Sequence, residues 1–152
     1  MAARAADEGR GRLKHRIKHI AITAEDPFVT AELFKRAFGL EELSRGDSEI
    51  AREVYLTDGD INLAIVCWKR TPENPNPYPE GYGLDHFGFQ VDDLDAAEMR
   101  ARAAGAAPQP PPKIDRARMD GRIFFEKKLE LAGVKFDLSS EGWPTTRAGS
   151  NF

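Results

Sequence analysis

The sequence predicts an α+β fold in which two βαβββ repeats form curved mixed sheets around a concave site, with the helices packed outside. The main observation is an internal repeat, because a strand, a helix and further strands follow in the same order at residues 17–70 and 84–141. A second observation is that a histidine stands at the same point of the first strand in both repeats. A third is the length of 152 residues, at which two separate cores would each be marginal. We therefore expect one domain over residues 17–141.

The first repeat begins with an alternating, β-branched strand at residues 17–23. Asp26 can cap the next helix and Pro27 suits its first position, and Gly39 ends the helical spacing. Two strands are then predicted, at 49–57 and 61–68, joined by an Asp-Gly turn.

The second repeat follows a connector at 71–83 that is too rich in Pro and Gly for regular structure. Its elements are a strand at 84–91, a helix capped by Asp92 or Asp93 and ended by Gly105, and closing strands at 123–131 and 134–139. His19 lies seven residues before Asp26, and His86 lies seven before Asp93. This equal spacing indicates two copies of one unit.

Alternation along the strands sorts the polar side chains onto one face. Ile20 and Ile22 share a face that should pack under a helix, while His19 lies opposite. The second repeat gives the same result, with Phe87, Phe89 and Val91 on one face and His86 on the other. Both histidines should therefore face away from the helices.

Asp137 and Asn62 are the polar residues of the later strands and stand at corresponding places of the two repeats. Imidazole and carboxylate donors on one side of a sheet are what a divalent metal needs. A lone strand histidine is more often a hydrogen-bonded structural group, but the repeat favours a site. We predict a metal held by His19, His86 and Asp137, with Asn62 as a fourth candidate and Fe, Zn, Ni, Co and Mn all open.

The segments HIAI, LDHFGF and LAGVKFDLS resemble the vicinal-oxygen-chelate superfamily of glyoxalases, ring-cleaving dioxygenases and bleomycin-resistance proteins, over residues 17–141. The resemblance implies metal ligands on the first and last strands of each half. Asp137 stands where the family usually has Glu, and Asn62 where Glu or Gln is common.

The resemblance also implies a metal-dependent enzyme, a lyase, isomerase or dioxygenase, whose ion polarises vicinal oxygens of a small-molecule substrate. The alternative is a metal-free protein that binds a small molecule or a drug, as bleomycin-resistance proteins do. Members of this superfamily commonly form homodimers, which we also expect here.

The sequence offers less support for catalytic residues than for metal ligands. Tyr55 and Tyr82 can donate protons and Arg52 can hold an anion, but such residues more often serve packing or the surface. The loops at 44–48, 70–83 and 106–122 are expected to form the pocket walls.

Composition excludes some classes of partner. The net charge of −3 is spread over interspersed residues of both signs, which disfavours nucleic acid. Residues 1–16 have no apolar core of a signal peptide and are expected to be a disordered extension, and no stretch has the length of a membrane span. With the single Cys67, these features predict a cytoplasmic protein. Residues 142–152 are expected to be a C-terminal tail, whose Trp143 packs over the core or meets a partner.

Overall fold

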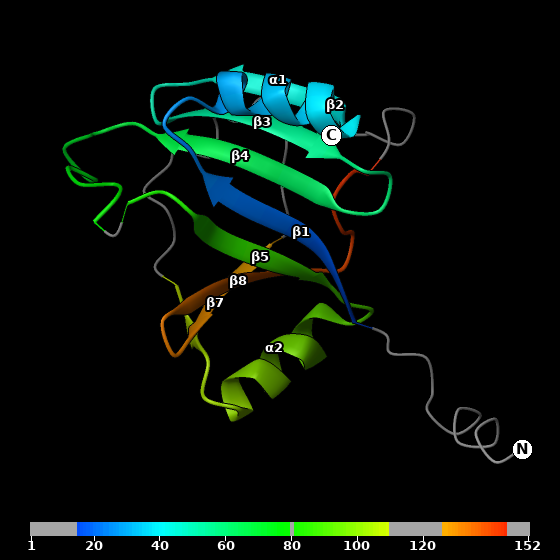
Figure 1. Ribbon diagram of the computed structural model, residues 1–152. Coiled ribbons are helices and arrows are strands. Elements are labelled where there is room, and N and C mark those ends of the chain that lie inside the picture. Colours follow the sequence, from blue (N-terminus) through cyan, green and yellow to red (C-terminus); the bar gives the residue numbers. More distant parts are fainter. Residues whose placement is uncertain (1–14, 80, 110–125, 146–152) are drawn as a thin grey trace, which may run out of the picture.

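A computed structural model describes residues 15–79, 81–109 and 126–145. Two helices and eight strands occur there, and the strands form one mixed sheet in the order β2-β3-β4-β1-β5-β8-β7-β6 (Figure 1). The elements are β1 (Arg16–Thr23), α1 (Pro27–Phe38), β2 (Glu41–Asp47), β3 (Ala51–Thr57), β4 (Asn62–Trp68), β5 (Leu84–Gln90), α2 (Leu94–Ala103), β6 (Ala107–Pro108), β7 (Lys127–Leu131) and β8 (Val134–Ser139).

The two predicted βαβββ repeats are confirmed, and they share a single sheet. Their first strands, β1 and β5, lie side by side and antiparallel at its centre. Each is flanked by the last strand of its own repeat, because β4 is parallel to β1 and β8 is parallel to β5. The first strand and the last strand of each repeat, which were predicted to carry the polar residues, are therefore the four central strands.

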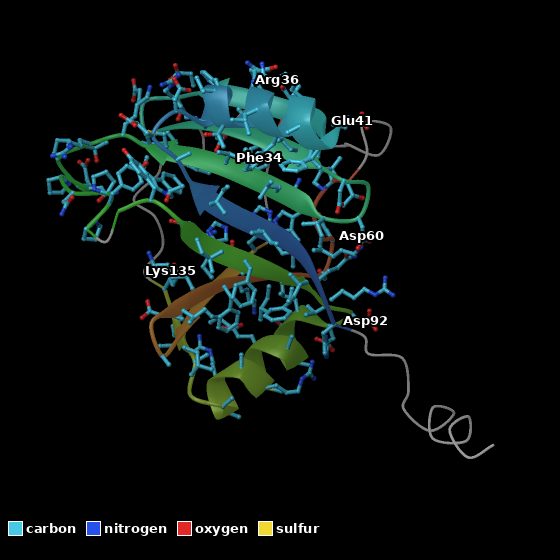
Figure 2. The ribbon with its side chains drawn as sticks, viewed as in Figure 1. Phe34, Arg36, Glu41, Asp60, Asp92 and Lys135 are labelled. Carbon is cyan, nitrogen blue, oxygen red and sulfur yellow. The ribbon has the colours of Figure 1, made fainter. Side chains whose placement is uncertain are left out.

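The helices cover the face that alternation assigned to them. Ala31 and Phe34 of α1 pack with Ile22 and Ile65, and Phe34 points toward the sheet while Arg36 lies on the outer side of the helix (Figure 2). In the second repeat, Ala97 of α2 belongs to a cluster with other apolar residues, among them Phe87, Phe89, Val91, Phe136 and Leu138. The opposite face carries His19 and a cluster of smaller residues that includes Ala21, Ala51 and Ala64.

Helix boundaries follow the predicted caps. The Asp26 carboxylate accepts hydrogen bonds from the backbone N–H groups of Phe28 and Val29, and Gly39 adopts a left-handed conformation with φ of 68°. In the second helix it is Asp93, not Asp92, that accepts from Ala96 N–H. Both helices therefore begin where the chain leaves the central strand.

The strand β2 was missed in the sequence. Its residues EELSRGD have low strand propensity and no hydrophobic alternation. It forms because β3 offers it a backbone ladder, and it lies at the edge of the sheet, where charged side chains are exposed and protect the edge. Residues 44–47, which were predicted to be loop, belong to this strand.

Several predicted segments fall wholly or partly outside the described residues. These are residues 1–14 of the extension, 110–122 of the third loop, 123–125 of the closing strand and 146–152 of the tail. Arg16 is already the first residue of β1, and the closing pair is described from Lys127 onward. No helix in the described ranges is long and apolar enough to span a membrane.

Candidate active site

A pair of β-bulges precedes the two histidines. The register between β1 and β5 is interrupted twice, so that Lys18 is an extra residue on β1 and Asp85 is an extra residue on β5. Each bulged residue comes directly before a histidine, at matching positions of the two repeats. Because a bulge re-aims nearby side chains, it allows His19 and His86 to turn toward each other across the central strands.

His19 is held in a neutral, enclosed setting. Only 3% of it is exposed, and its Nδ1 lies 2.8 Å from Oδ1 of Asn62, its register partner on β4. Nδ2 of Asn62 donates to the Pro144 carbonyl at 2.8 Å, which fixes the amide so that Oδ1 accepts from His19 Nδ1–H. Burial, together with the neighbouring His86, lowers the pKa of His19 to about 4, so the ring is neutral at pH 7.

His86 has charged partners instead. Its Nδ1 lies 2.6 Å from Oδ2 of Asp85, the bulged residue, and a carboxylate can only accept there. The other oxygen, Oδ1, accepts from the indole N–H of Trp68 at 3.3 Å. Burial opposes ionisation of Asp85, but its interactions with His86, Trp68 and Lys135 together outweigh burial and lower the pKa of this carboxyl. A chain from Trp68 through Asp85 thus fixes the His86 ring.

These partners leave both Nε2 atoms facing each other, 3.2 Å apart. When each Nδ1–H donates to its partner, the two Nε2 atoms turn toward the same point, and a proton or a metal cation has to lie between them. Two nitrogen ligands that each lie ~2.1 Å from one ion are about 3.0 to 3.4 Å apart. The spacing of the two histidines therefore fits adjacent ligands of one ion.

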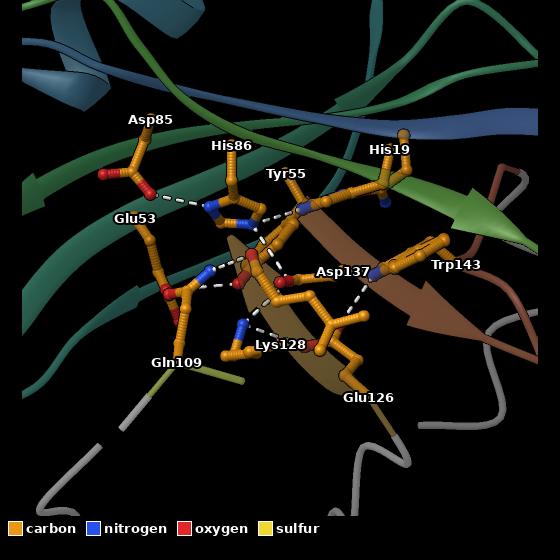
Figure 3. Close-up of polar contacts among 12 residues, drawn as sticks. His19, Glu53, Tyr55, Asp85, His86, Gln109, Glu126, Lys128, Asp137 and Trp143 are labelled. Carbon is orange, nitrogen blue, oxygen red and sulfur yellow. Dashed lines mark hydrogen bonds and ion pairs between the residues drawn. The ribbon is translucent and has the colours of Figure 1, made fainter. Parts of the chain in front are cut away.

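The third predicted ligand is engaged elsewhere. Asp137 is 1% exposed, and its Oδ2 lies 3.3 Å from His86 Nε2 but 2.7 Å from the Lys128 ammonium (Figure 3). As the side chains stand, no three His, Cys, Asp or Glu residues in the described ranges form a group that could hold a metal. The donor types and the nitrogen spacing fit a metal, whereas the carboxylate would have to exchange its lysine partner for the ion.

Lys128 and Glu126 complete a partly buried charge cluster with Asp137. Burial raises the pKa of Asp137. Burial also disfavours the charged form of Lys128, but the carboxylates of Glu126 and Asp137 outweigh burial and raise the pKa of this amine. Burial likewise disfavours the charged form of Glu126, yet Lys128 and the Trp143 N–H lower the pKa of its carboxyl.

Residues 142–145 form a strap over this part of the sheet. The Trp143 ring stacks on His19 with centroids 4.9 Å apart and planes 11° apart, and its Nε1 donates to Glu126 Oε1 at 2.7 Å. The ring lies over Gly88, where a Cβ atom would come within 2.4 Å of it. Of the tail expected at 142–152, these four residues thus pack on the chain's own candidate site.

Tyr55 and Glu53 of β3 line the same face, as alternation with Ala51 requires (Figure 3). The Tyr55 hydroxyl lies 3.2 Å from Glu53 Oε2, and burial raises the pKa of both groups. Tyr82, by contrast, is 54% exposed and packs on the Tyr78 ring in the connector.

Arg52 is not available to this site. It lies on the helix side of β3, with its guanidinium 4.5 Å from the centroid of the Phe28 ring and 3.4 Å from Asp26. Arg52 thus has the packing role that is more common for such residues, because alternation along β3 puts it on the helix side and Glu53 on the site face.

The expected equivalence of Asn62 and Asp137 is also inexact. Asn62 is the register partner of His19, whereas Asp137 is the partner of Gly88, two residues beyond His86. Asn62 consequently contacts Nδ1 of His19, which points away from the other histidine. Asp137 instead approaches Nε2 of His86, the nitrogen that faces His19.

An open mixed sheet built from two βαβββ halves, with a histidine at the same point of each first strand, defines the vicinal-oxygen-chelate class. The chain belongs to the glyoxalase/bleomycin resistance protein/dioxygenase superfamily, whose family model matches residues 18–125. This match includes His19 and His86 and ends before Asp137. A comparison with curated protein sequences found no match.

Solved structures show the same fold at low sequence identity. A hypothetical protein from Bacillus halodurans C-125 is 14% identical with a TM-score of 0.61, over 82% of this chain and 92% of its own. Methylmalonyl-CoA epimerase from Mycobacterium tuberculosis is 16% identical with a TM-score of 0.60, over 80% and 85% of the two chains. A methylmalonyl-CoA epimerase in complex with methylmalonyl-CoA and NH4+ is 20% identical with a TM-score of 0.54, over 85% and 98%.

Proposed function

We propose that this chain is a metal-dependent enzyme for a small-molecule substrate, with a divalent ion held by His19, His86 and Asp137. The observation that carries the proposal is the pair of Nε2 atoms 3.2 Å apart, each on a ring whose Nδ1 is already engaged. Asn62 then orients His19 from the second coordination shell instead of ligating the ion. When bound, such an ion would polarise a carbonyl oxygen of the substrate as a Lewis acid.

We further propose that the reaction is a proton transfer next to that carbonyl, as in an epimerase, isomerase or lyase. Glu53 supports this, because it is a largely buried carboxylate on the site face and burial raises its pKa toward the range useful for a general base. The Tyr55 hydroxyl, 3.2 Å away, would hold the carboxylate in place. Zn, Ni, Co or Mn would serve this chemistry, whereas Fe would favour a dioxygenase.

Metal analysis of the protein purified without chelator tests the site, together with His19→Ala, His86→Ala and Asp137→Ala. We expect about one ion per chain, lost in each of the three variants, since a tetrahedral or octahedral site rarely survives without one of three protein ligands. His15→Ala is the matched control, because His15 is exposed and contacts Arg100. A protein that cannot be loaded with metal, or variants that retain it like His15→Ala, would refute the proposal.

Glu53→Gln tests the proton transfer. The similarity to methylmalonyl-CoA epimerases makes methylmalonyl-CoA the first substrate to assay, by the incorporation of solvent deuterium. We expect exchange to fall by on the order of 100-fold or more in Glu53→Gln, with metal content unchanged. Exchange at the wild-type rate in the variant would exclude Glu53 as the base, and no exchange in the wild type would exclude this substrate.

A metal-free binding protein is the second candidate, and the Lys128–Asp137 ion pair favours it because the carboxylate already has a cation. Such a protein would bind its ligand equally well with and without a chelator in calorimetry. A homodimer and a cytoplasmic location remain predictions, the first of which sedimentation at micromolar concentration would test.

A further inference from the structure

We propose that Lys128 is a built-in competitor of the metal, whose ammonium group neutralises Asp137 in the metal-free protein and gives up that carboxylate when an ion binds. The inference rests on the proposed function, since it concerns the same site. It goes beyond that function in assigning to one residue the control of metal affinity.

The first support is that lysine and metal would use the same oxygen. Lys128 Nζ lies 2.7 Å from Asp137 Oδ2, and this Oδ2 also lies 3.3 Å from His86 Nε2. An ion bound to His86 and Asp137 would have to bind beside that oxygen. A lysine ammonium and a divalent cation at such short range repel each other strongly in a poorly solvated setting. If the Lys128 ammonium and the metal ion both contact Asp137, the protein binds the ion more weakly.

The second support is that Lys128 has somewhere to go. Its ammonium lies 3.3 Å from Oε2 of Glu126, whose Oε1 is anchored by the Trp143 N–H. The lysine side chain is also 35% exposed, whereas that of Asp137 is 1% exposed. Release from Asp137 would therefore leave the ammonium paired with Glu126 and partly hydrated, which avoids the cost of an unpaired buried charge.

The third support is the balance of charge around the histidines. Asp137, Glu126 and Asp85 bring three carboxylates close to two imidazoles, and Lys128 is the cation that contacts two of them. Without any cation, the buried Asp137 would face His86 and Glu126 unneutralised. Metal binding in this setting is an exchange of one cation for another, and the lysine sets how tightly the ion is held.

Competition with a chromophoric chelator would measure the affinity for Zn²⁺ and Co²⁺ in the wild type, Lys128→Met and Lys128→Arg. We expect Lys128→Met to bind both ions tighter by on the order of tenfold or more, because a repelling charge is gone. Lys128→Arg keeps that charge and should stay near the wild type. The visible spectrum of bound Co²⁺ should keep its shape, since the ligands are the same.

Lys127→Met is the matched control. Lys127 precedes Lys128 on β7 but pairs with Asp95, at 2.7 Å, and with Glu98, both on the side of α2. Lys127→Met removes one positive charge, as Lys128→Met does, but leaves the contacts of Asp137 intact. The metal affinity of Lys127→Met should therefore equal that of the wild type. Urea unfolding of each variant checks that it folds, and Lys128→Gln replaces Lys128→Met if the latter does not.

The outcomes separate the two proposals. Equal affinities of Lys128→Met and Lys127→Met would overturn the competition and leave the metal site intact. Weaker binding by Lys128→Met would also overturn it, because Lys128 would then position Asp137 for the ion. If neither the wild type nor any Lys128 variant binds Zn²⁺ or Co²⁺, both proposals fail. Binding by Lys128→Met alone would support the competition and refute the metal function of the native chain.

Discussion

The two histidines occupy the same position of two repeats but have opposite surroundings. His19 lies between a neutral amide, Asn62, and the Trp143 ring, and His86 lies between the carboxylates of Asp85 and Asp137. The bulged residue before each histidine differs in the same sense, because Lys18 turns to Asp60 while Asp85 turns to its own histidine. The repeat thus determines where the rings are, and each half determines which charged or neutral groups surround its own ring.

Acid should expose this difference most strongly. The pKa of His19 is lowered from 6.5 to about 4 by burial, so between these values the unfolded chain binds a proton that the folded chain does not. The contribution of His19 to stability is therefore full above pH 6.5 and is lost as the pH falls to about 4. The loss in the metal-free protein amounts to about 3 kcal/mol.

Urea unfolding of chelator-treated protein from pH 7 to pH 4 measures this loss. In His19→Gln the free energy of unfolding should depend less on pH than in the wild type. His15→Gln, which changes an exposed histidine, should show the pH dependence of the wild type. If the free energy of unfolding falls equally with pH in His19→Gln and the wild type, the burial of His19 does not govern the sensitivity to acid.

Gly88 is the repeat counterpart of Ala21, and it has no Cβ atom where Ala21 has one. A Cβ at Gly88 would lie 2.4 Å from the Trp143 ring, so Gly88→Ala should push the ring off His19 and destabilise the fold by about 2 kcal/mol. Gly46→Ala is the control in another strand, where the nearest atom would be 3.5 Å away and the change should be small. Equal free energies of unfolding for the two variants would contradict the close approach of Trp143.

Asp85→Asn tests the charged partner of His86. One amide oxygen cannot accept from both Trp68 and His86, so the ring should lose its fixed tautomer and metal affinity should fall by about tenfold. Nitrogen-15 shifts of the imidazole report the tautomer, and the His19 signals serve as an internal control. Unaltered His86 shifts would show that Asp85 does not orient the ring.

The smallest effect should come from Thr57, which helps to hold the strap on the His19 side alone. Its hydroxyl lies 2.8 Å from the Ile61 carbonyl and 3.1 Å from the Thr145 carbonyl, shares its one hydrogen between them, and accepts from Gly59 N–H at 2.9 Å. Thr57→Val should cost about 1 kcal/mol of stability. Thermal unfolding gives the cost, and the emission of Trp143 shows whether the strap has loosened; unchanged values in both would mean that this hydroxyl is dispensable.

The fold, and the face of the sheet on which both histidines lie, could be predicted from the sequence because they depend on local patterns. Alternation put His19 and His86 on one face, and the spacing to Asp26 and Asp93 revealed the repeat. Alternation did not predict β2, because this strand forms through its backbone hydrogen bonds to β3. It also overlooked Glu53, although the same alternation that placed Tyr55 would have placed Glu53 beside it.

The partners of the histidines could not be predicted in the same way. A bulge reverses the alternation locally, so no strand pattern would turn Asp85 and His86 to the same side. Lys128 and Glu126 meet Asp137 and Trp143 through hairpin register and a chain reversal that a single sequence does not specify. The strand pattern therefore predicts where the two histidines of the candidate site lie, but not which charged groups surround them.

The strap has a consequence for the order in which the protein matures. Asn62 and Pro144 are 82 residues apart in the sequence, and Thr57 and Thr145 are 88 apart. Contacts between such distant residues form slowly, because closing the long intervening loop costs entropy. During synthesis His19 leaves the ribosome well before Trp143, so any ion that depends on a correctly set His19 would be loaded only after Trp143 has emerged.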